Sequence, residues 1–220
     1  MVASYSRHFV LSTRHDGLHT STMNAKASER LLLWVDAVGG YLVCPAEKIV
    51  LGQAVPGAEV DVPLMADLSN RHATICRDGE NYLILPIRPI RLAGREVESA
   101  AVLADGQEIE LGRGVKLRFR RPHPLSATAR LEFASHHRTQ PPVDSIILMA
   151  DTCVLGPTYR SHVVCRGWSR EVVLFRQGES LGCRTDGDFE IDGVACHGQG
   201  PVTRRSRIAG DDFAMSLEPV

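Results

Sequence analysis

The stretch that decides the fold is Leu68-Ser69-Asn70-Arg71-His72-Ala73-Thr74-Ile75. Its four polar residues, from Ser69 to His72, are too polar in succession for a buried strand. Ala73 and Ile75, and further along Leu83 and Leu85, alternate with other residues in the two-residue period of a half-buried strand pair. The polar residues are therefore predicted to form a loop on a β scaffold, where recognition surfaces are common.

Short apolar strands separated by turn residues run along the chain on both sides of this loop. The turns contain Gly39-Gly40, Pro56-Gly57, Asp78-Gly79, Ala93-Gly94 and Asp105-Gly106, and glycine accepts the positive φ that tight turns need. No segment shows helical periodicity over three turns. Many short strands at regular spacing predict an all-β sandwich or barrel. The predicted strands are 31–35, 41–44, 48–51, 59–62, 73–76, 82–85, 96–97, 107–111 and 115–119.

Four motifs in this region stand in a fixed order. They are Val50-Leu51-Gly52, Ser69-Asn70-Arg71-His72, Ala93-Gly94 and the closing Asp-Gly-Gln-Glu-Ile-Glu-Leu-Gly of residues 105–112. Through this ordered set, residues 31–121 resemble a forkhead-associated (FHA) domain. The resemblance implies a β-sandwich whose loops bind a phosphothreonine peptide.

The resemblance also implies which residues form the binding site. The expected peptide-binding residues are Ser69, Asn70, Arg71, Gln53 and Arg88, and the expected structural residues of the loops are His72, Gly52 and Gly94. The chain departs from the family at two of these positions. Gln53 follows Leu-Gly where the family has a phosphate-binding Arg, and Arg88 replaces the Asn of the family's Asn-Gly-Thr loop.

The two departures leave two interpretations open. The loss of one charge-assisted hydrogen bond removes about 1.5–3 kcal/mol. Either Arg71 and Arg88 supply the missing charge, or the site no longer binds phosphate and Ser69 and Arg71 only shape the loop. The first interpretation predicts a phosphopeptide-binding adaptor. The second predicts a phosphate-independent structural or assembly module of β-sandwich type, with a protein partner or another copy of the chain, so a homo-oligomer stays open.

Several motifs recur about one hundred residues later. Cys153-Val154-Leu155-Gly156 is similar to residues 49–52, Trp168-Ser169-Arg170-Glu171 to residues 68–71, and residues 208–213 to the closing motif. We therefore predict two FHA-like units in tandem, the second one shortened, with Ser169 and Arg170 at its loop. In that alignment Val172 takes the place of the family's His. The expected organisation is a tail at 1–29, an FHA domain at 30–122, a linker at 123–144 and a degenerate FHA-like domain at 145–220.

The composition and the missing motifs of the chain argue against several classes of function. The chain has 220 residues, 23% of them charged, and a formal net charge of -1, so no global field attracts nucleic acid or an anionic membrane. No apolar run reaches the roughly 20 residues of a membrane span. Six widely spaced cysteines without a secretory signal predict reduced thiols and a cytoplasmic protein. Motifs for phosphate loops, nucleophile elbows and metal ligands are missing, so we predict neither an enzyme nor a cofactor or metal site.

Overall fold

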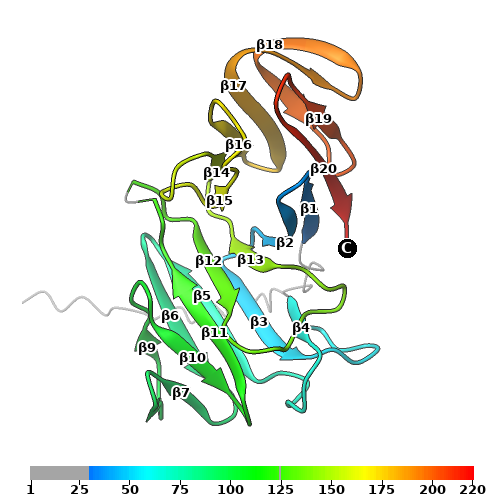
Figure 1. The fold of residues 1–220 in the computed structure, drawn as a ribbon. Helices are drawn as coiled ribbons and strands as arrows, with labels where there is room; N and C mark the ends of the chain where they lie inside the picture. Colours follow the sequence, from blue (N-terminus) through cyan, green and yellow to red (C-terminus); the bar gives the residue numbers. More distant parts are fainter. Residues whose placement is uncertain (1–29, 124) are drawn as a thin grey trace, which may run out of the picture.

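The computed structural model describes residues 30–123 and 125–220, and these residues contain β-strands and no helix. The predicted all-β class is therefore confirmed, while the predicted tail lies outside the described residues. The strands form a five-stranded sheet and a 15-stranded sheet. In Figure 1 the strands are arranged in a lower and an upper part, and the 15-stranded sheet runs through both. The lower part, the first unit, contains β1 (Leu31–Val35), β2 (Gly39–Cys44), β3 (Lys48–Gln53), β4 (Val62–Leu64), β5 (Ala73–Asp78), β6 (Asn81–Pro86), β7 (Ile90–Leu92), β8 (Arg95–Glu96), β9 (Ala101–Val102), β10 (Glu108–Leu111), β11 (Val115–Arg120), β12 (Ala129–Phe133) and β13 (Ser145–Leu148).

The upper part, the second unit, follows directly on β13. Its strands are β14 (Thr152–Gly156), β15 (Val163–Val164), β16 (Val172–Gln177), β17 (Ser180–Ile191), β18 (Val194–Val202), β19 (Arg207–Ala209) and β20 (Ala214–Pro219). The large sheet runs β15-β14-β16-β17-β19-β20-β1-β2-β13-β12-β11-β10-β7-β8, with β18 paired to β17. The small sheet runs β4-β3-β5-β6-β9 and belongs to the first unit.

The first unit is a sandwich of the small sheet against one half of the large sheet. The alternating residues of β3, β5, β6 and β11 that point inward are fully buried, among them Ile49, Ile75, Ile84 and Phe119. Tyr82 packs its ring 5.2 Å from that of Phe119 and donates its hydroxyl hydrogen to a backbone carbonyl oxygen of the β12–β13 region. A half-buried two-residue period thus produces this core, as the sequence predicted.

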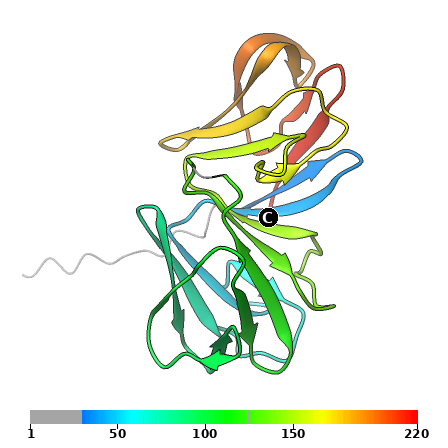
Figure 2. The ribbon, with the colours of Figure 1, turned by 60° about the vertical axis from the view of Figure 1, so that its left-hand side comes forward.

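The hairpin β1–β2 and strand β13 are shared by the two units. Leu32, Leu42 and Ile146 face the core of the first unit, whereas Leu33 and Val43 face the core of the second. Figure 2 shows the blue hairpin between the green strands below and the orange strands above. Because successive side chains of a strand point to opposite faces, one hairpin completes two cores. The units are therefore joined through a common layer of strands.

The predicted linker of residues 123–144 contains a core strand, which corrects that boundary. Within it, β12 pairs with β11 on one side and β13 on the other, and Ala129 and Leu131 are fully buried in the first core. The Pro, His, Ser and Thr residues that indicated a linker lie on both sides of β12. The alternation in Ala129–Phe133 outweighs their composition, because burial follows the two-residue period.

The strand pairings of the first unit recur in the second. In the first, Leu51 lies opposite Val62 in a parallel pair and opposite Ala73 in an antiparallel pair. In the second, the corresponding partners are Leu155 with Val163 and with Val172.

The turns recur as well, 99 residues later. Ala93 and Asp192 both have positive φ, 48° and 53°, and each is followed by a glycine with positive φ. The Ala93 N–H donates to the oxygen of Glu108 at 2.9 Å, and the Asp192 N–H donates to the oxygen of Arg207 at 2.8 Å.

A side chain also caps the same strand position in both units. Asp61 Oδ2 accepts a hydrogen bond from the N–H of Val50 at 2.7 Å, and His162 Nδ1 accepts one from the N–H of Val154 at 2.8 Å. His162 is fully buried. Burial, with help from His123 and Arg130, lowers the pKa of His162 from 6.5 to about 4, so its ring is neutral and can accept at Nδ1.

We expect His162 to make the protein less stable in acid. Its folded pKa lies below its unfolded value, so the unfolded state binds more protons between about pH 6.5 and 4. The free energy of unfolding should fall through this window as pH decreases, by up to about 1.4 kcal/mol per pH unit. Urea denaturation at several pH values measures the slope. His162→Asn, which keeps an acceptor, should flatten it, whereas the exposed His136→Asn should not. An unchanged slope in His162→Asn would contradict this assignment.

Candidate functional site

The polar loop of residues 68–72 lies at the end of β3, next to the residue that follows Leu51-Gly52. The N–H of Gln53 donates to the oxygen of Ser69 at 3.1 Å, and the N–H of His72 donates to the oxygen of Leu51 at 2.8 Å. Gln53 and Ser69 are half-buried, and Asn70 is exposed. The structure thus brings the predicted residues of these two segments together.

The end of β3 and the loop of residues 68–72 can approach closely because residue 52 is a glycine. A Cβ on Gly52 would lie 1.9 Å from the backbone oxygen of Asn70, far inside any real contact distance. Gly112 has the same function on the other side of the loop, because its Cβ would lie 2.7 Å from Cδ2 of Leu68. Gly112 also has a φ of 53°, which favours glycine. The two Leu-Gly motifs therefore fix the position of the loop.

His72 joins this loop to the next one. Its backbone oxygen accepts hydrogen bonds from the N–H groups of Ile87 and Arg88 at 3.0 and 2.9 Å. Its ring Nε2 lies 3.2 Å from the oxygen of Pro89, so Nε2 carries the proton that it donates there. Burial, with a smaller contribution from Arg88, lowers the pKa of His72. A neutral, largely buried His72 therefore braces the segment that carries Arg88 against the segment that carries Ser69.

Three arginines lie on the segments that meet at His72. Arg71 precedes it, and Arg88 is bonded to it through the backbone. Arg113 lines an open cavity of about 400 Å³ together with His72, Pro89 and two carboxylates, Glu96 and Glu110. All three side chains are exposed. Within residues 30–123 and 125–220, none of them forms a side-chain hydrogen bond or ion pair. We call residues 68–72, 87–89 and 112–114 the open loop end.

Arg113 was not predicted as a site residue. It lies between Gly112 and Gly114 in the turn from β10 to β11, about forty residues along the chain from His72. The close approach of Gly112 to Leu68 and His72 brings this turn to the loop. Gly94, which was predicted as a structural residue of the loops, lies in the β7–β8 turn with a φ of 82°. No hydrogen bond between the described residues joins that turn to residues 68–72.

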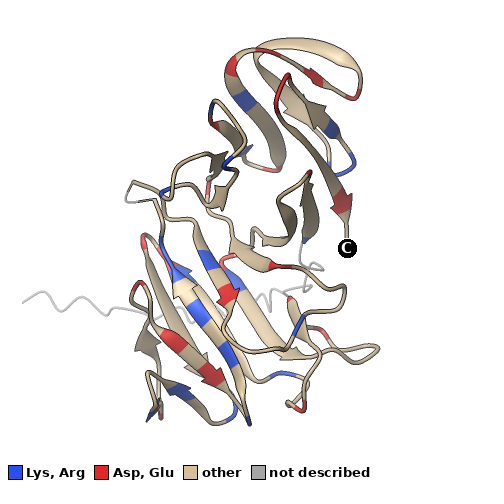
Figure 3. Ribbon diagram, in the orientation of Figure 1, with Lys and Arg blue, Asp and Glu red and all other residues tan. Residues whose placement is uncertain are grey.

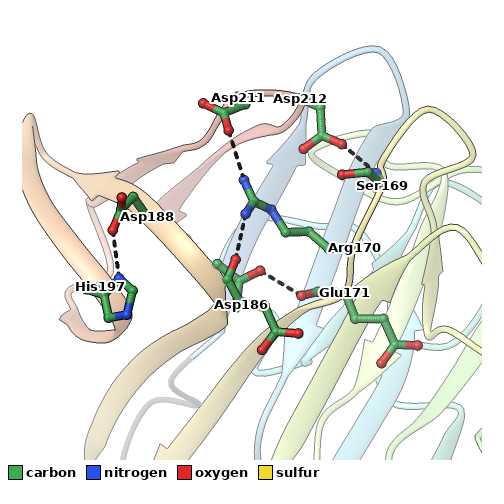
Figure 4. A network of polar contacts seen from close by, with 9 residues as sticks. Ser169, Arg170, Glu171, Asp186, Asp188, His197, Asp211 and Asp212 are labelled. Atoms are coloured by element: carbon green, nitrogen blue, oxygen red, sulfur yellow. Dashed lines mark hydrogen bonds and ion pairs between the residues drawn. The ribbon is translucent and has the colours of Figure 1, made fainter.

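At the corresponding end of the second unit, Ser169 and Arg170 are bonded to aspartate residues of the same unit (Figure 4). The N–H of Ser169 donates to Asp212 Oδ2 at 2.5 Å. Hydrogen bonding from Ser169, with its side chain as the larger cause and its backbone N–H as the smaller, holds the pKa of Asp212 below its usual value. Arg170 donates to the backbone oxygen of Asp186 at 2.6 Å and pairs with Asp211 at 3.3 Å. Both predicted residues of the second loop are thus engaged within the chain. We call residues 169–171, 186–188 and 211–212 the closed loop end.

The strand registers also correct the alignment of this second loop. Since Leu155 lies opposite Val172 as Leu51 lies opposite Ala73, the residue before Val172 corresponds to His72. That residue is Glu171, whereas the sequence alignment placed Val172 there. The chain between β14 and β16 is shorter than that between β3 and β5, and the sequence motif gave no sign of where the deletion falls.

Comparisons with known proteins return only partial matches. No family model and no curated protein matches the chain. A solved structure of Mycobacterium tuberculosis EmbR in complex with a low-affinity phosphopeptide is 26% identical, with a TM-score of 0.32, over 45% of this chain and 26% of the EmbR chain. The Rv0020c FHA structure is 25% identical, with a TM-score of 0.27, over 40% of this chain and 90% of that chain. Part of this chain is thus similar to a part of EmbR and to the Rv0020c FHA structure.

Residues 30–123 and 125–220 contain no group of three or more His, Cys, Asp or Glu side chains placed to hold a metal ion. They also contain no helix that could cross a membrane. The open loop end is therefore the candidate functional site.

Proposed function

We propose that the open loop end binds a phosphorylated segment of a partner protein. The observations that carry this proposal are the three exposed arginines, Arg71, Arg88 and Arg113, on the segments that meet at His72, and the cavity that Arg113 lines beside His72. Within the described residues they have no polar partner that would have to be displaced. Exposed cations on a braced loop can bind an anion with little cost in reorganisation.

The chemistry of the site fits a phosphate group. A phosphate dianion accepts bidentate hydrogen bonds from the planar guanidinium of arginine, which is stronger than a bond to a neutral donor. Gln53 cannot supply that charge, but its N–H is bonded to the segment that carries Arg71, and that segment is bonded through His72 to the one that carries Arg88. Ser69 and Gln53 add neutral donors. The charge that is missing after Leu51-Gly52 is in this way offset by arginines from neighbouring segments.

A second function is favoured for the second unit. The repeated pairings and turns support the inference that residues 145–220 are a second FHA-like unit, and the one arginine of its closed loop end, Arg170, is already engaged by Asp186 and Asp211. We infer that this unit has a structural role, completing the shared layer of β1, β2 and β13. The whole chain would then act as a cytoplasmic interaction module, with no enzymatic activity, cofactor, nucleic-acid or membrane partner of its own.

Peptide binding tests the proposal. Phosphothreonine, phosphoserine and unphosphorylated peptide libraries should be titrated against the full chain, and only the phosphorylated forms are expected to bind. Arg71→Ala and Arg88→Ala should each weaken binding by about ten-fold or more, since each removes a charge-assisted hydrogen bond. Arg205→Ala is the matched control, because Arg205 is exposed in the second unit and should not matter.

Two outcomes would contradict the proposal. Equal binding of phosphorylated and unphosphorylated peptides would favour the phosphate-independent assembly module instead. Phosphate-dependent binding that survives Arg71→Ala and Arg88→Ala but is lost in Arg205→Ala would place the site elsewhere.

A further inference from the structure

The outer face of the small sheet is apolar. Val50 on β3 lies opposite Thr74 on β5, which lies opposite Leu85 on β6. In the next row Cys76 lies opposite Leu83, which lies opposite Val102 on β9. Residues directly opposite on one face are in contact, so these six side chains form one continuous surface. We call it the apolar face: Val50, Thr74, Cys76, Leu83, Leu85 and Val102.

This surface is not covered by the described part of the chain. Leu85 is 37% exposed and Val102 is 61% exposed, and Ile87, which follows β6, is 44% exposed. The other four residues of the apolar face are half-buried by their neighbours. Contiguous exposed apolar surface on a soluble protein marks an interaction site.

The opposite sheet of the same sandwich shows what an ordinary solvent-facing surface looks like in this protein. The outward residues of β10 and β11 are charged, and Figure 3 shows red and blue segments along these strands. Lys116 pairs with Glu108 at 3.0 Å across them. The outer face of β10 and β11 is thus polar, as is usual for a solvent-exposed surface, whereas the apolar face of the small sheet is not.

The second unit provides an internal comparison. Val173 lies opposite Arg184 there, as Thr74 lies opposite Leu85 in the first unit. Arg184 is exposed. The strand pairing therefore accepts a charged residue at the position of Leu85, so the fold itself does not require an apolar side chain there.

Charged residues at one rim of the apolar face indicate what covers it. Lys48 lies opposite Cys76 at the start of β3, and Asp78 follows Cys76 by two residues on the same face of β5. Both are exposed, and within the described residues neither side chain forms a hydrogen bond or an ion pair. A two-fold symmetric contact pairs a surface with itself, so a rim that carries both signs is self-complementary.

We propose that a second copy of this chain packs against the apolar face, with Lys48 of one copy near Asp78 of the other. The edge strands β4 and β9 have three and two residues, so pairing along an edge would add few hydrogen bonds, and the contact is face to face. The open loop end lies at the opposite end of β3 from Lys48, so the charged rim of the contact is away from it. The resulting dimer presents two open loop ends, but its formation does not depend on what they bind.

The mass of the full chain in solution tests this proposal. Light scattering or sedimentation at concentrations up to about 100 μM should give twice the chain mass of 24.1 kDa. Leu85→Arg installs the residue type that the second unit carries and should raise the dimer dissociation constant about ten-fold or more. Leu125→Arg is the matched control, since Leu125 is 91% exposed and outside the apolar face. Far-UV circular dichroism confirms that each variant folds, and Val102→Arg replaces Leu85→Arg if the latter does not.

A charge exchange makes the test specific to the symmetric contact. Lys48→Asp should weaken the dimer, and Lys48→Asp combined with Asp78→Lys should restore it. A monomeric wild-type chain over this concentration range, or a dimer that persists in folded Leu85→Arg and Val102→Arg, would overturn the proposal. A wild-type monomer would mean that a different partner covers the face.

Discussion

A chain that ends at residue 122 is expected not to fold. In the large sheet, β2 pairs with β13, β13 with β12 and β12 with β11. Removal of everything after residue 122 deletes both intervening strands, so the hairpin β1–β2 loses its connection to β10 and β11. The first core also loses Leu131 and Ile146. The expected loss is the whole free energy of folding, about 5–15 kcal/mol for a domain.

Circular dichroism and urea denaturation check this expectation. A chain of residues 30–220 retains every described strand and should unfold cooperatively. A chain of residues 30–150 regains the first core but leaves Leu33, Val43 and Ile147 without the second core that buries them, so it should be soluble only at low concentration. A cooperative unfolding transition in the chain of residues 30–122 would show that the shared strands are dispensable.

Gly52→Ala should be the most damaging single substitution at the open loop end. The new Cβ would meet the backbone oxygen of Asn70 at 1.9 Å and the side chain of Val60 at 3.0 Å. A backbone oxygen cannot rotate away as a side chain can, so the loop itself must move. We expect a loss of about 2–3 kcal/mol of stability, together with loss of peptide binding, because Ser69 and Arg71 move with the loop.

Gly167→Ala is the matched control for this substitution. A Cβ on Gly167 meets nothing within 4 Å, so its stability should stay within about 0.5 kcal/mol of the wild type. The two variants are compared by thermal or urea unfolding and by peptide titration. Wild-type stability in Gly52→Ala would mean that the loop is not packed against β3 as described.

Local patterns were sufficient to predict the loop and many of the strands. The period-2 alternation after Ser69 and the glycine turns act within a few residues, and the structure has strands and turns at most of the places that they indicate. The strand predicted at 59–62 was wrong in its bounds, because β4 (Val62–Leu64) overlaps it at Val62 alone. The shared hairpin could not be predicted in this way, since β1 pairs with β20 at the other end of the chain. One sign was present: Leu31-Leu32-Leu33 is apolar without alternation, which is typical of a strand buried on both faces.

The same distinction between local patterns and long-range contacts applies to the residues of the candidate site. Gln53, Ser69 and Arg88 come from motifs that the sequence contains, and the backbone hydrogen bonds bring their segments together. Arg113 and the engagement of Arg170 by Asp211 depend on contacts between residues about forty positions apart. Such contacts are set by the registers of β10 with β11 and of β19 with β20, which no local pattern specifies.

The central claim is that the two units have one open and one closed loop end. An amide NMR titration with a phosphothreonine peptide library tests it most directly, because it reports on every backbone N–H separately. We predict shifts at Ser69 to His72, at Arg88 and at Gly112 to Gly114, with Ser169 to Glu171 unchanged. Shifts at the Ser169 segment, or identical shifts with unphosphorylated peptides, would contradict the account.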